Sequence, residues 1–238
     1  MNRQWDGSVF VPALRERRLQ GQKLVVVLED ACLEVVHVGE GRHEVLSGTK
    51  AGHRRLLRRA GRAESRDLRP DIVYQCLCAL LESPINRSGG LLLYIHTQNG
   101  LMIEVNPQLR CPRTYTEFES LFGTLLVKRN VRARGAKVTL LQIVKNDLSQ
   151  ILPPGCRKIG LEVHGRHVDL NHVQQDLQRE NKNVCQPIVV FIGAVAHGSP
   201  IARERNEFVE DELCISKYHL SAAECCHRIC HAVEQVWL

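Results

Sequence analysis

Apolar and polar positions alternate along this chain with two different periods, which predicts a mixture of strands and helices. The run from Lys23 to Leu28 is apolar after its first residue and bounded by charge, as in a strand buried on both faces. Residues 91–97 and 101–105 form two more strands, and Asn99-Gly100 between them is a strong hairpin signal. Shorter apolar runs predict further strands at 33–38, 138–144, 159–163, 187–192 and 213–215.

Three stretches carry apolar residues at helical spacing behind a recognisable start. Pro70 suits the first position of a helix that ends at Ser83-Pro84, because its missing N–H is not needed there. Thr114–Glu117 and Ser221–Glu224 are capping boxes, and the second begins a final helix that runs to Trp237. A more polar helix is predicted with its inner side at Leu170, Val173 and Leu177.

Strands that alternate with helices predict an α/β sandwich with a largely parallel sheet, to which the hairpin adds an antiparallel portion. Residues 1–21 are polar and basic without a clear period, so we expect a mobile tail followed by one domain over 22–238. Inserted segments are expected at about 39–67, which is charged and irregular except around Leu56 and Leu57, and at about 91–106. Residues 201–212 form a further charged insertion.

Composition narrows the class of protein only modestly. The net charge of +6, with 32 Lys and Arg residues, fits a nucleic-acid partner but is shared by many proteins. Ten cysteines could indicate disulfides, but residues 1–18 lack an apolar signal segment and several cysteines occupy apolar positions. We therefore expect free thiols in a reducing compartment and, since no apolar run is long enough to span a bilayer, no membrane.

Two loops at strand ends have the features that a small cofactor needs. The first follows the strand at 187–192 and contains Gly193 and Gly198, which let the backbone approach a ligand closely. The second follows residue 215 and leads into the helix start at Ser221, whose free N–H groups can hold an anionic group. For both glycines a plain turn role is the alternative. Neither a dinucleotide-binding fingerprint, a phosphate loop nor a Gly-x-Ser-x-Gly elbow occurs.

The motif set resembles one family, the eukaryotic ribosome-biogenesis methyltransferases that modify N1 of a pseudouridine in small-subunit ribosomal RNA, which belong to the knotted SPOUT class. The resemblance covers roughly residues 22–238 in unbroken motif order. It implies a C-terminal trefoil knot, S-adenosylmethionine as methyl donor with S-adenosylhomocysteine as product, no metal, a homodimer, small-subunit processome and ribosomal-protein partners, and a nuclear, nucleolar location. The motifs that carry it are Arg69–Ile72, Ser83–Arg87, Tyr94–Gln98, Ile103–Pro107, Arg110–Thr114, Val144–Asn146, Phe191–Gly198, Ile215–Ala223 and Glu234–Trp237.

The same resemblance implies which residues line the cofactor. Lys217 and His219 stand where relatives commonly have Asn and Pro, so contacts through the backbone would survive this change better than contacts through side chains. The cofactor residues implied are Leu161, Gly193, Gly198, Ile215, Ser216, Lys217, Tyr218, His219 and Leu220.

Arg69 and Asp71 are the residues that the resemblance makes catalytic. The resemblance implies that Arg69 meets the substrate RNA and stabilises charge, while Asp71 steadies it and is a candidate base. Without the resemblance, Asp71 is better explained as a plain helix-terminus residue that complements the helix dipole. Arg110 and Arg113 are implied RNA contacts, with solvated surface arginines as the alternative. Glu117 replaces an arginine that is common among relatives, and its capping role explains the acid.

Two remaining motifs have competing interpretations. The basic run His53–Arg59 is either an additional RNA-binding arm or a solvated helix face. Cys225, Cys226 and Cys230 with neighbouring histidines suggest zinc, but the cysteines lie on an apolar stripe, which favours core packing. We therefore predict an RNA methyltransferase; the alternatives are a non-catalytic rRNA-binding assembly factor with the same fold, or a SPOUT enzyme acting on tRNA or another base. Binding of S-adenosylmethionine separates enzyme from assembly factor.

Overall fold

A computed structural model describes most of the chain. The predicted N-terminal tail, residues 1–21, lies outside the described residues, as does most of the predicted insertion at 201–212. The described residues are 23–39, 41–62, 68–135, 137–145, 148–152, 155–171, 173–175, 187–197 and 209–238.

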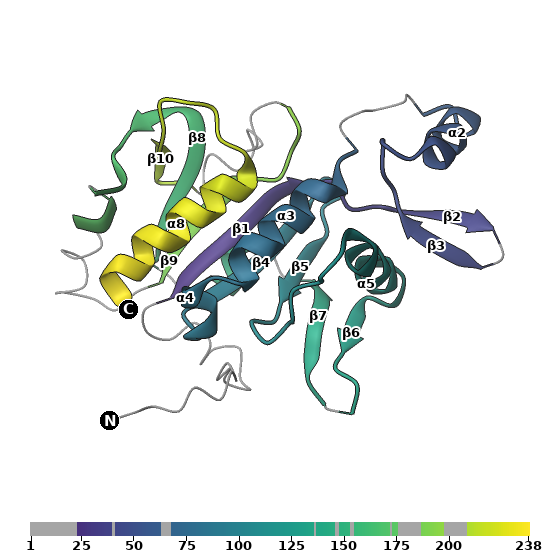
Figure 1. Cartoon of the computed structure of the whole chain (residues 1–238), viewed down its shortest axis with the longest axis horizontal. Coiled ribbons are helices and arrows are strands. Elements are labelled where there is room, and N and C mark those ends of the chain that lie inside the picture. The colour runs from purple at the N-terminus through teal and green to yellow at the C-terminus, as the bar shows by residue number, and fades with distance from the viewer. Residues whose placement is uncertain are drawn as a thin grey trace.

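An eight-stranded sheet with the strand order β10-β8-β9-β1-β4-β5-β7-β6 forms the centre of the molecule (Figure 1). The pairs from β10 through β4 are parallel, and those from β4 through β6 are antiparallel. The predicted largely parallel sheet with an antiparallel portion is confirmed. The strands are β1 (Leu24–Ala31), β4 (Leu91–Thr97), β5 (Met102–Val105), β6 (Asn130–Arg132), β7 (Thr139–Val144), β8 (Arg157–His167), β9 (Ile188–Gly193) and β10 (Asp211–Cys214).

Two helices, α3 (Pro70–Leu81) and α8 (Ala222–Trp237), lie side by side on one face of this sheet (Figure 1). Both start as predicted, with Pro70 in the first turn of α3 and Ser221 capping α8. Pro84, expected only to end the first helix, also begins the short α4 (Pro84–Arg87), because Ser83 caps the Asn86 N–H. The other helices on the sheet are α5 (Tyr115–Lys128) and α6 (Leu148–Ile151).

Burial on both faces explains the continuous apolar run of β1. Val26 and Leu28 pack in the large core beneath α3 and α8, whereas Val25 and Val27 face a second core that includes Ile151 of α6. Each of these four β1 side chains is fully buried. A central parallel strand needs apolar residues at every position, since successive side chains point to opposite faces.

A hairpin and a helix project from the end of β1 (Figure 1). Strands β2 (Val35–Gly39) and β3 (Arg42–Val45) form their own antiparallel sheet, and α2 (Ala51–Arg59) follows. We call residues 32–62 the arm. The helical spacing predicted around Leu56 and Leu57 is confirmed by α2. The irregular structure predicted before it was wrong at β3, whose residues are mostly polar and exposed and carry no apolar run by which a strand could be recognised.

Other predicted elements differ in detail. The hairpin at 91–106 is integral to the main sheet, because β4 pairs with β1 on one side and β5 on the other. Strand β6 and helix α6 were not predicted, being three and four residues long. The polar helix is present at 170–171 and 173–175, with Leu170 and Val173 packed on the core as expected; Leu177 lies outside the described residues.

All nine described cysteines are free thiols, as predicted. Cys226 and Cys230 are buried in the core beneath α8, and burial, reinforced for Cys226 by Cys76, raises the pKa of both thiols. Neutral thiols of this kind pack as small hydrophobic groups. Among the described residues, no helix is both long and apolar enough to cross a membrane.

Candidate active site at the carboxyl edge of the parallel strands

The carboxyl ends of the parallel strands meet at one edge of the sheet, which we call the carboxyl edge (Figure 1). The loops at 194–197 and 215–220 leave β9 and β10 at this edge. Helices α3 and α8 also begin here and run back to the opposite edge, where Glu234 of α8 accepts a hydrogen bond from the Ile85 N–H. Open parallel sheets bind ligands in the crevice outside such an edge.

The loop after β9 is held against the end of β1. Gly193 pairs in register with Glu29, and the Ala194 N–H donates to the Glu29 carbonyl at 2.8 Å. Ala194 is buried and Gly193 half-buried, so the loop leaves the sheet from a fixed position. Leu161 of β8 pairs in register with Ile192 of β9, and its side chain lies in the core. Gly198 lies outside the described residues.

The loop after β10 presents its backbone rather than a buried set of side chains. Ile215 is buried, Ser216 and Leu220 are half-buried, and Lys217, Tyr218 and His219 are exposed. The Ser216 hydroxyl accepts from the Tyr218 N–H at 3.0 Å, which shapes the turn. Neither Lys217 nor His219 has a positive φ, so the departures from the family pattern cause no backbone strain.

Ser221 ends this loop and caps α8, its hydroxyl accepting from the Glu224 N–H at 3.2 Å. The Ser221 half of the predicted capping box thus fixes the helix start beside residues 215–220, while the Glu224 carboxylate accepts from Arg228. Free N–H groups of a first helical turn attract anions. The helix start beside the exposed loop backbone therefore suits a ligand with an anionic end.

Arg69 and Asp71 form a bidentate ion pair at the start of α3. Arg69 Nε lies 2.8 and 3.0 Å from the two Asp71 carboxylate oxygens, and Nη2 lies 2.6 Å from Oδ2. This hydrogen bonding outweighs partial burial and raises the pKa of Arg69. Both side chains remain partly exposed, at 38% and 29%, so the held guanidinium is accessible to a ligand.

Arg110 and Arg113 are exposed on the loop before α5. Thr114 accepts from the Glu117 N–H at 3.2 Å, which confirms Thr114 as the helix cap, while the Glu117 carboxylate reaches back one residue further than a capping box does and accepts from the Arg113 N–H at 2.8 Å. Glu117 therefore has a structural role that explains the acid. The structure places this loop beside α3, because the Cys111 and Cys78 sulfurs lie 3.5 Å apart.

An aromatic cluster joins α3 to α5 next to the Arg69–Asp71 pair. Tyr74 meets Tyr115 edge-on with ring centroids 5.8 Å apart, and Phe118 packs against both rings. Burial raises the pKa of Tyr115, and the nearby Glu119 and Asp71 carboxylates raise it further. The phenol is thus neutral, and sequence analysis missed this supporting residue because one aromatic at a helix start carries no distinctive signal.

A second feature that sequence analysis missed lies at the ends of β1 and β4. Buried Glu29 pairs with His96 at 3.1 Å, and Asp30, whose φ is +53°, completes the group. Among the described residues, these three form the one group of three or more His, Cys, Asp or Glu side chains close enough together to share one ion. The sequence motif Tyr94–Gln98 contains His96 and could have indicated this site, but it does not identify Glu29 as the partner of His96.

A cavity of about 440 Å³ lies between α8 and the sheet, lined among others by Leu24, Ile188 and Val233. It shares no residue with the predicted cofactor set. The structure brings the described members of the predicted cofactor loops and the Arg69–Asp71 pair to the carboxyl edge. Arg110 and Arg113 do not lie at that edge: they are on the loop after antiparallel β5, which leaves the sheet near α4 and runs along α3.

Comparison with known proteins identifies relatives of the whole fold. The model of the EMG1/NEP1 methyltransferase family matches residues 26–234. The chain is 40% identical over 232 residues to the ribosomal RNA small subunit methyltransferase NEP1 of Candida albicans, covering 94% of this chain and 82% of that protein. It is 40% identical over 238 residues to the human protein of the same name, covering 98% and 90%.

A solved structure has the same fold. The crystal structure of Archaeoglobus fulgidus Nep1 bound to S-adenosylhomocysteine matches with a TM-score of 0.65 over 91% of this chain and 99% of that chain, at 24% identity. This likeness confirms the predicted SPOUT-type α/β fold class with a largely parallel sheet. The trefoil knot stays a prediction.

Proposed function

The chain belongs to the EMG1/NEP1 methyltransferase family, and from this premise we propose that it methylates N1 of a pseudouridine in small-subunit ribosomal RNA with S-adenosylmethionine as donor. The family match over residues 26–234 carries the proposal. The names of the relatives supply the RNA substrate, and the archaeal neighbour's S-adenosylhomocysteine supplies the class of cofactor.

The carboxyl edge suits this cofactor. Leu161, Ala194 and Ile215 are buried apolar residues that fix where the two loops leave the sheet, and residues 217–219 between them and α8 are exposed. The start of α8 favours the donor's carboxylate. When bound, the donor supplies a methyl group already activated on a sulfonium, so the protein's task is mainly alignment.

Arg69 has the electrostatic role in this proposal. Pseudouridine is attached to ribose through carbon, so its N1 carries a proton and becomes a good nucleophile only as that proton leaves. A guanidinium fixed beside the ring stabilises the negative charge that develops, and it needs no reorganisation because Asp71 already holds it. The target base has to be unstacked from its loop to reach this site.

The geometry favours Asp71 as a positioning group over Asp71 as the base. Both of its carboxylate oxygens accept hydrogen bonds from Arg69, so removing a substrate proton would first require the pair to open. The same pair orients the planar guanidinium toward the RNA.

Methyl transfer to two matched RNA hairpins tests this function. The hairpins share one sequence, and the target position is pseudouridine in one and uridine in the other; both are incubated with methyl-labelled donor. We expect label only in the pseudouridine hairpin, since N1 of uridine is bonded to the ribose. Label in both or neither hairpin, with folded protein that binds both RNAs, would contradict the proposal.

We further propose that the protein acts as a homodimer in the nucleolus, among processome and ribosomal proteins of the small subunit. Family membership supports this setting. Light scattering of the purified protein is expected to give twice the mass of one chain, 27.0 kDa. A monomer at micromolar concentration would contradict the dimer.

A further inference from the structure

The outer face of α2 is strongly basic. This nine-residue helix contains four arginines and no acidic residue. His53 and Leu57 form its buried side, while Arg55, Arg58 and Arg59 are exposed. Arg54 has a local role, donating to the carbonyls of Gly48 and Thr49 at 3.1 and 3.0 Å.

This arrangement is electrostatically unfavourable for an isolated helix. Arg55 and Arg59 are four residues apart on the same face, and like charges at that spacing destabilise a helix. The helix dipole accounts for basic residues in the last turn, Arg58 and Arg59, but not for Arg55 in the middle. A bound anion would offset the repulsion.

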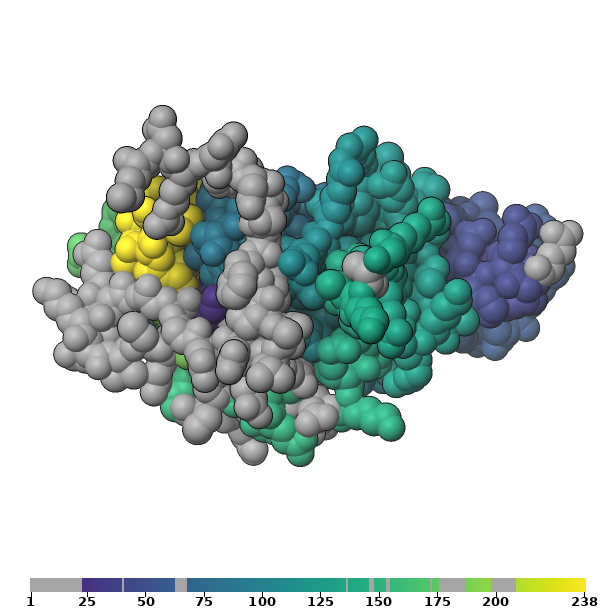
Figure 2. All heavy atoms as spheres, turned by 90° about the horizontal axis from the view of Figure 1, so that it is seen from below, coloured from purple at the N-terminus to yellow at the C-terminus, as the bar shows by residue number. Residues whose placement is uncertain are grey.

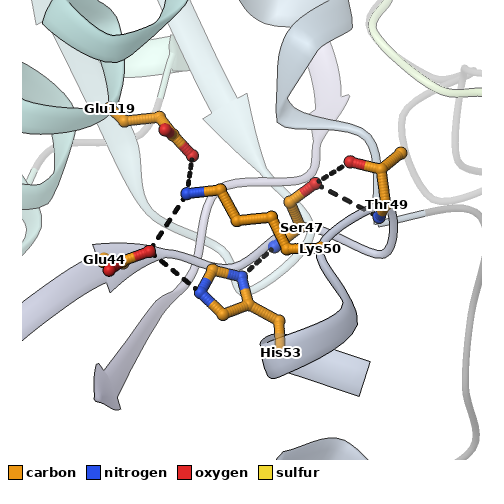
Figure 3. Close-up of polar contacts among 6 residues, drawn as sticks. All are labelled: Glu44, Ser47, Thr49, Lys50, His53 and Glu119. Atoms are coloured by element: carbon orange, nitrogen blue, oxygen red, sulfur yellow. Dashed lines mark hydrogen bonds and ion pairs between the residues drawn. The ribbon is translucent and has the colours of Figure 1, made fainter. Parts of the chain in front are cut away.

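The arm holds α2 in a fixed position through a polar network (Figure 3). Lys50 reaches Glu44 of β3 at 3.0 Å and Glu119 of α5 at 2.8 Å. Burial alone would lower the pKa of Lys50, but the two carboxylates raise it.

His53 contributes a second link. Its Nδ1 accepts from the Ser47 N–H at 3.1 Å, so the proton of the neutral ring is on Nε2, which faces Glu44 at 3.2 Å.

Two contacts join the arm to the elements of the proposed active site. Leu46 and Leu57 of the arm pack in one small apolar cluster with Leu68, which directly precedes Arg69. The Lys50–Glu119 pair connects it to α5, which follows Arg110 and Arg113. In space-filling view the arm forms a lobe at the end of the molecule away from α8 (Figure 2). RNA seated at the active site therefore has a basic surface beside it.

We propose that the exposed face of α2, centred on Arg55 and Arg59, binds the phosphate backbone of an RNA helix that flanks the target loop; this rests on the proposed RNA substrate. Phosphates are the anions that a row of guanidinium groups favours. The exposed face of the helix carries no aromatic side chain on which a base could stack, since the one aromatic ring, His53, is buried, so duplex phosphates are the better match than an unpaired strand.

Salt dependence of RNA binding tests the surface without involving methylation. The probes are a short pseudouridine hairpin and a long one with the same loop on an extended stem. For Arg55→Ala/Arg59→Ala, we expect the slope of log affinity against log salt on the long hairpin to be less negative by about 1.4 to 1.8, from about 0.7 to 0.9 per phosphate contact. The short hairpin should bind as before.

Two matched variants control for charge and for folding. Arg55→Lys/Arg59→Lys keeps both charges and should keep the slope. Arg62→Ala, on the same arm, removes a guanidinium that Glu34 already holds at 2.9 and 3.2 Å, and should also leave the slope unchanged. Thermal melting of each variant confirms that it is folded.

An unchanged slope on the long hairpin for folded Arg55→Ala/Arg59→Ala would overturn the proposal. An acidic segment of a partner protein would then be the better candidate to bind the exposed face of α2. An equal change in slope on both hairpins would also overturn it, since the contact would then lie within the loop. Failure of the proposed function is distinguishable, because it appears as absent methyl transfer in the parent protein.

Discussion

Arg69 and Asp71, which are separated by one proline, act together because their ion pair fixes the orientation of the guanidinium. Pro70 in the first helical turn sets the chain direction, and the bidentate contact locks the guanidinium over the helix start. The pair is a third exposed, so its contribution to the free energy of unfolding is small, about 1 kcal/mol or less. Its value is in orientation, which predicts that its loss affects activity more than stability.

Asp71→Asn tests that division. The amide can still accept one hydrogen bond but loses the charge, so we expect single-turnover methylation to slow by about ten- to one hundred-fold, in line with about 1.5–3 kcal/mol for a charged hydrogen bond. The melting temperature should fall by only a few degrees. The measurement is the rate across pH: a positioning role slows the reaction at every pH without removing an ionisation. An unchanged rate in folded protein would contradict both proposed roles of Asp71.

The Glu29–His96 pair shows a limit of sequence analysis at the residue scale. Its members lie 67 positions apart and meet only because β1 and β4 pair in parallel. Nothing in the alternation of apolar residues indicates which strands are neighbours. By contrast, Asp71, Thr114 and Ser221 were predictable because a helix start makes a local demand that a neighbouring side chain satisfies.

Strands β8 and β10 approach each other unusually closely at Gly165. A Cβ there would lie 2.7 Å from the Glu212 carbonyl oxygen and 2.9 Å from the Leu213 carbonyl carbon. These are backbone atoms, so β10 itself would have to move, and the loop at 215–220 would move with it. The element that presents the predicted cofactor loop thus depends on one glycine.

Gly165→Ala is expected to lower the free energy of unfolding by about 1–3 kcal/mol and to weaken binding of S-adenosylhomocysteine. Denaturant unfolding and calorimetry measure the two effects. Gly52→Ala is the control: its Cβ meets nothing within 4 Å and it lies in α2, so we expect a gain of about 0.5–1 kcal/mol with unchanged cofactor binding. Normal stability and affinity in Gly165→Ala would show that β10 tolerates displacement.

The attachment of the arm is expected to weaken in acid. The Lys50 hydrogen bond lowers the pKa of Glu44 below its ordinary 4.5, so the stabilisation is present above about pH 4.5 and is lost as pH falls through the lowered value. Lys50→Met removes that cause. We expect it to cost about 1–3 kcal/mol at pH 7, because it also leaves the largely buried Glu119 carboxylate without its partner, and to flatten the decline of melting temperature below pH 4.5. Parallel declines in the two proteins would contradict this linkage.

Elements with strong local signals were predicted, and those defined by tertiary contacts were not. Three local patterns each predicted one structure that is present: the apolar run of β1, the hairpin turn at Asn99-Gly100 and the helix caps. Strand β3 exists because it pairs with β2 and packs on α5, although its own residues are mostly polar. Strand order is likewise absent from any local pattern.

At the scale of the whole molecule, the predicted RNA surface is spread over separate elements. Arg69 begins α3, while Arg110 and Arg113 precede α5. If each neutralises one phosphate of a single-stranded target loop, log affinity for the short hairpin should fall with log salt at a slope of about −2. Replacing Arg110 and Arg113 by Ala should make the slope less negative by about 1.4. A slope that stays the same would remove both residues from the RNA interface.

The cofactor loops were partly predictable at this scale, because a glycine after one strand and a capped helix after another indicate ligand loops. Their meeting at one edge follows from parallel β9 and β10, with β8 between them, which the sequence pattern could not establish. The central claim is that these loops bind S-adenosylmethionine next to the Arg69–Asp71 pair.

Calorimetric titration of the purified full chain with S-adenosylhomocysteine tests that claim most directly, because it needs neither RNA nor catalysis. We expect measurable heat that saturates at one ligand per chain, together with a rise in melting temperature that grows with ligand concentration. Folded protein that shows neither heat nor thermal protection at millimolar ligand would contradict it.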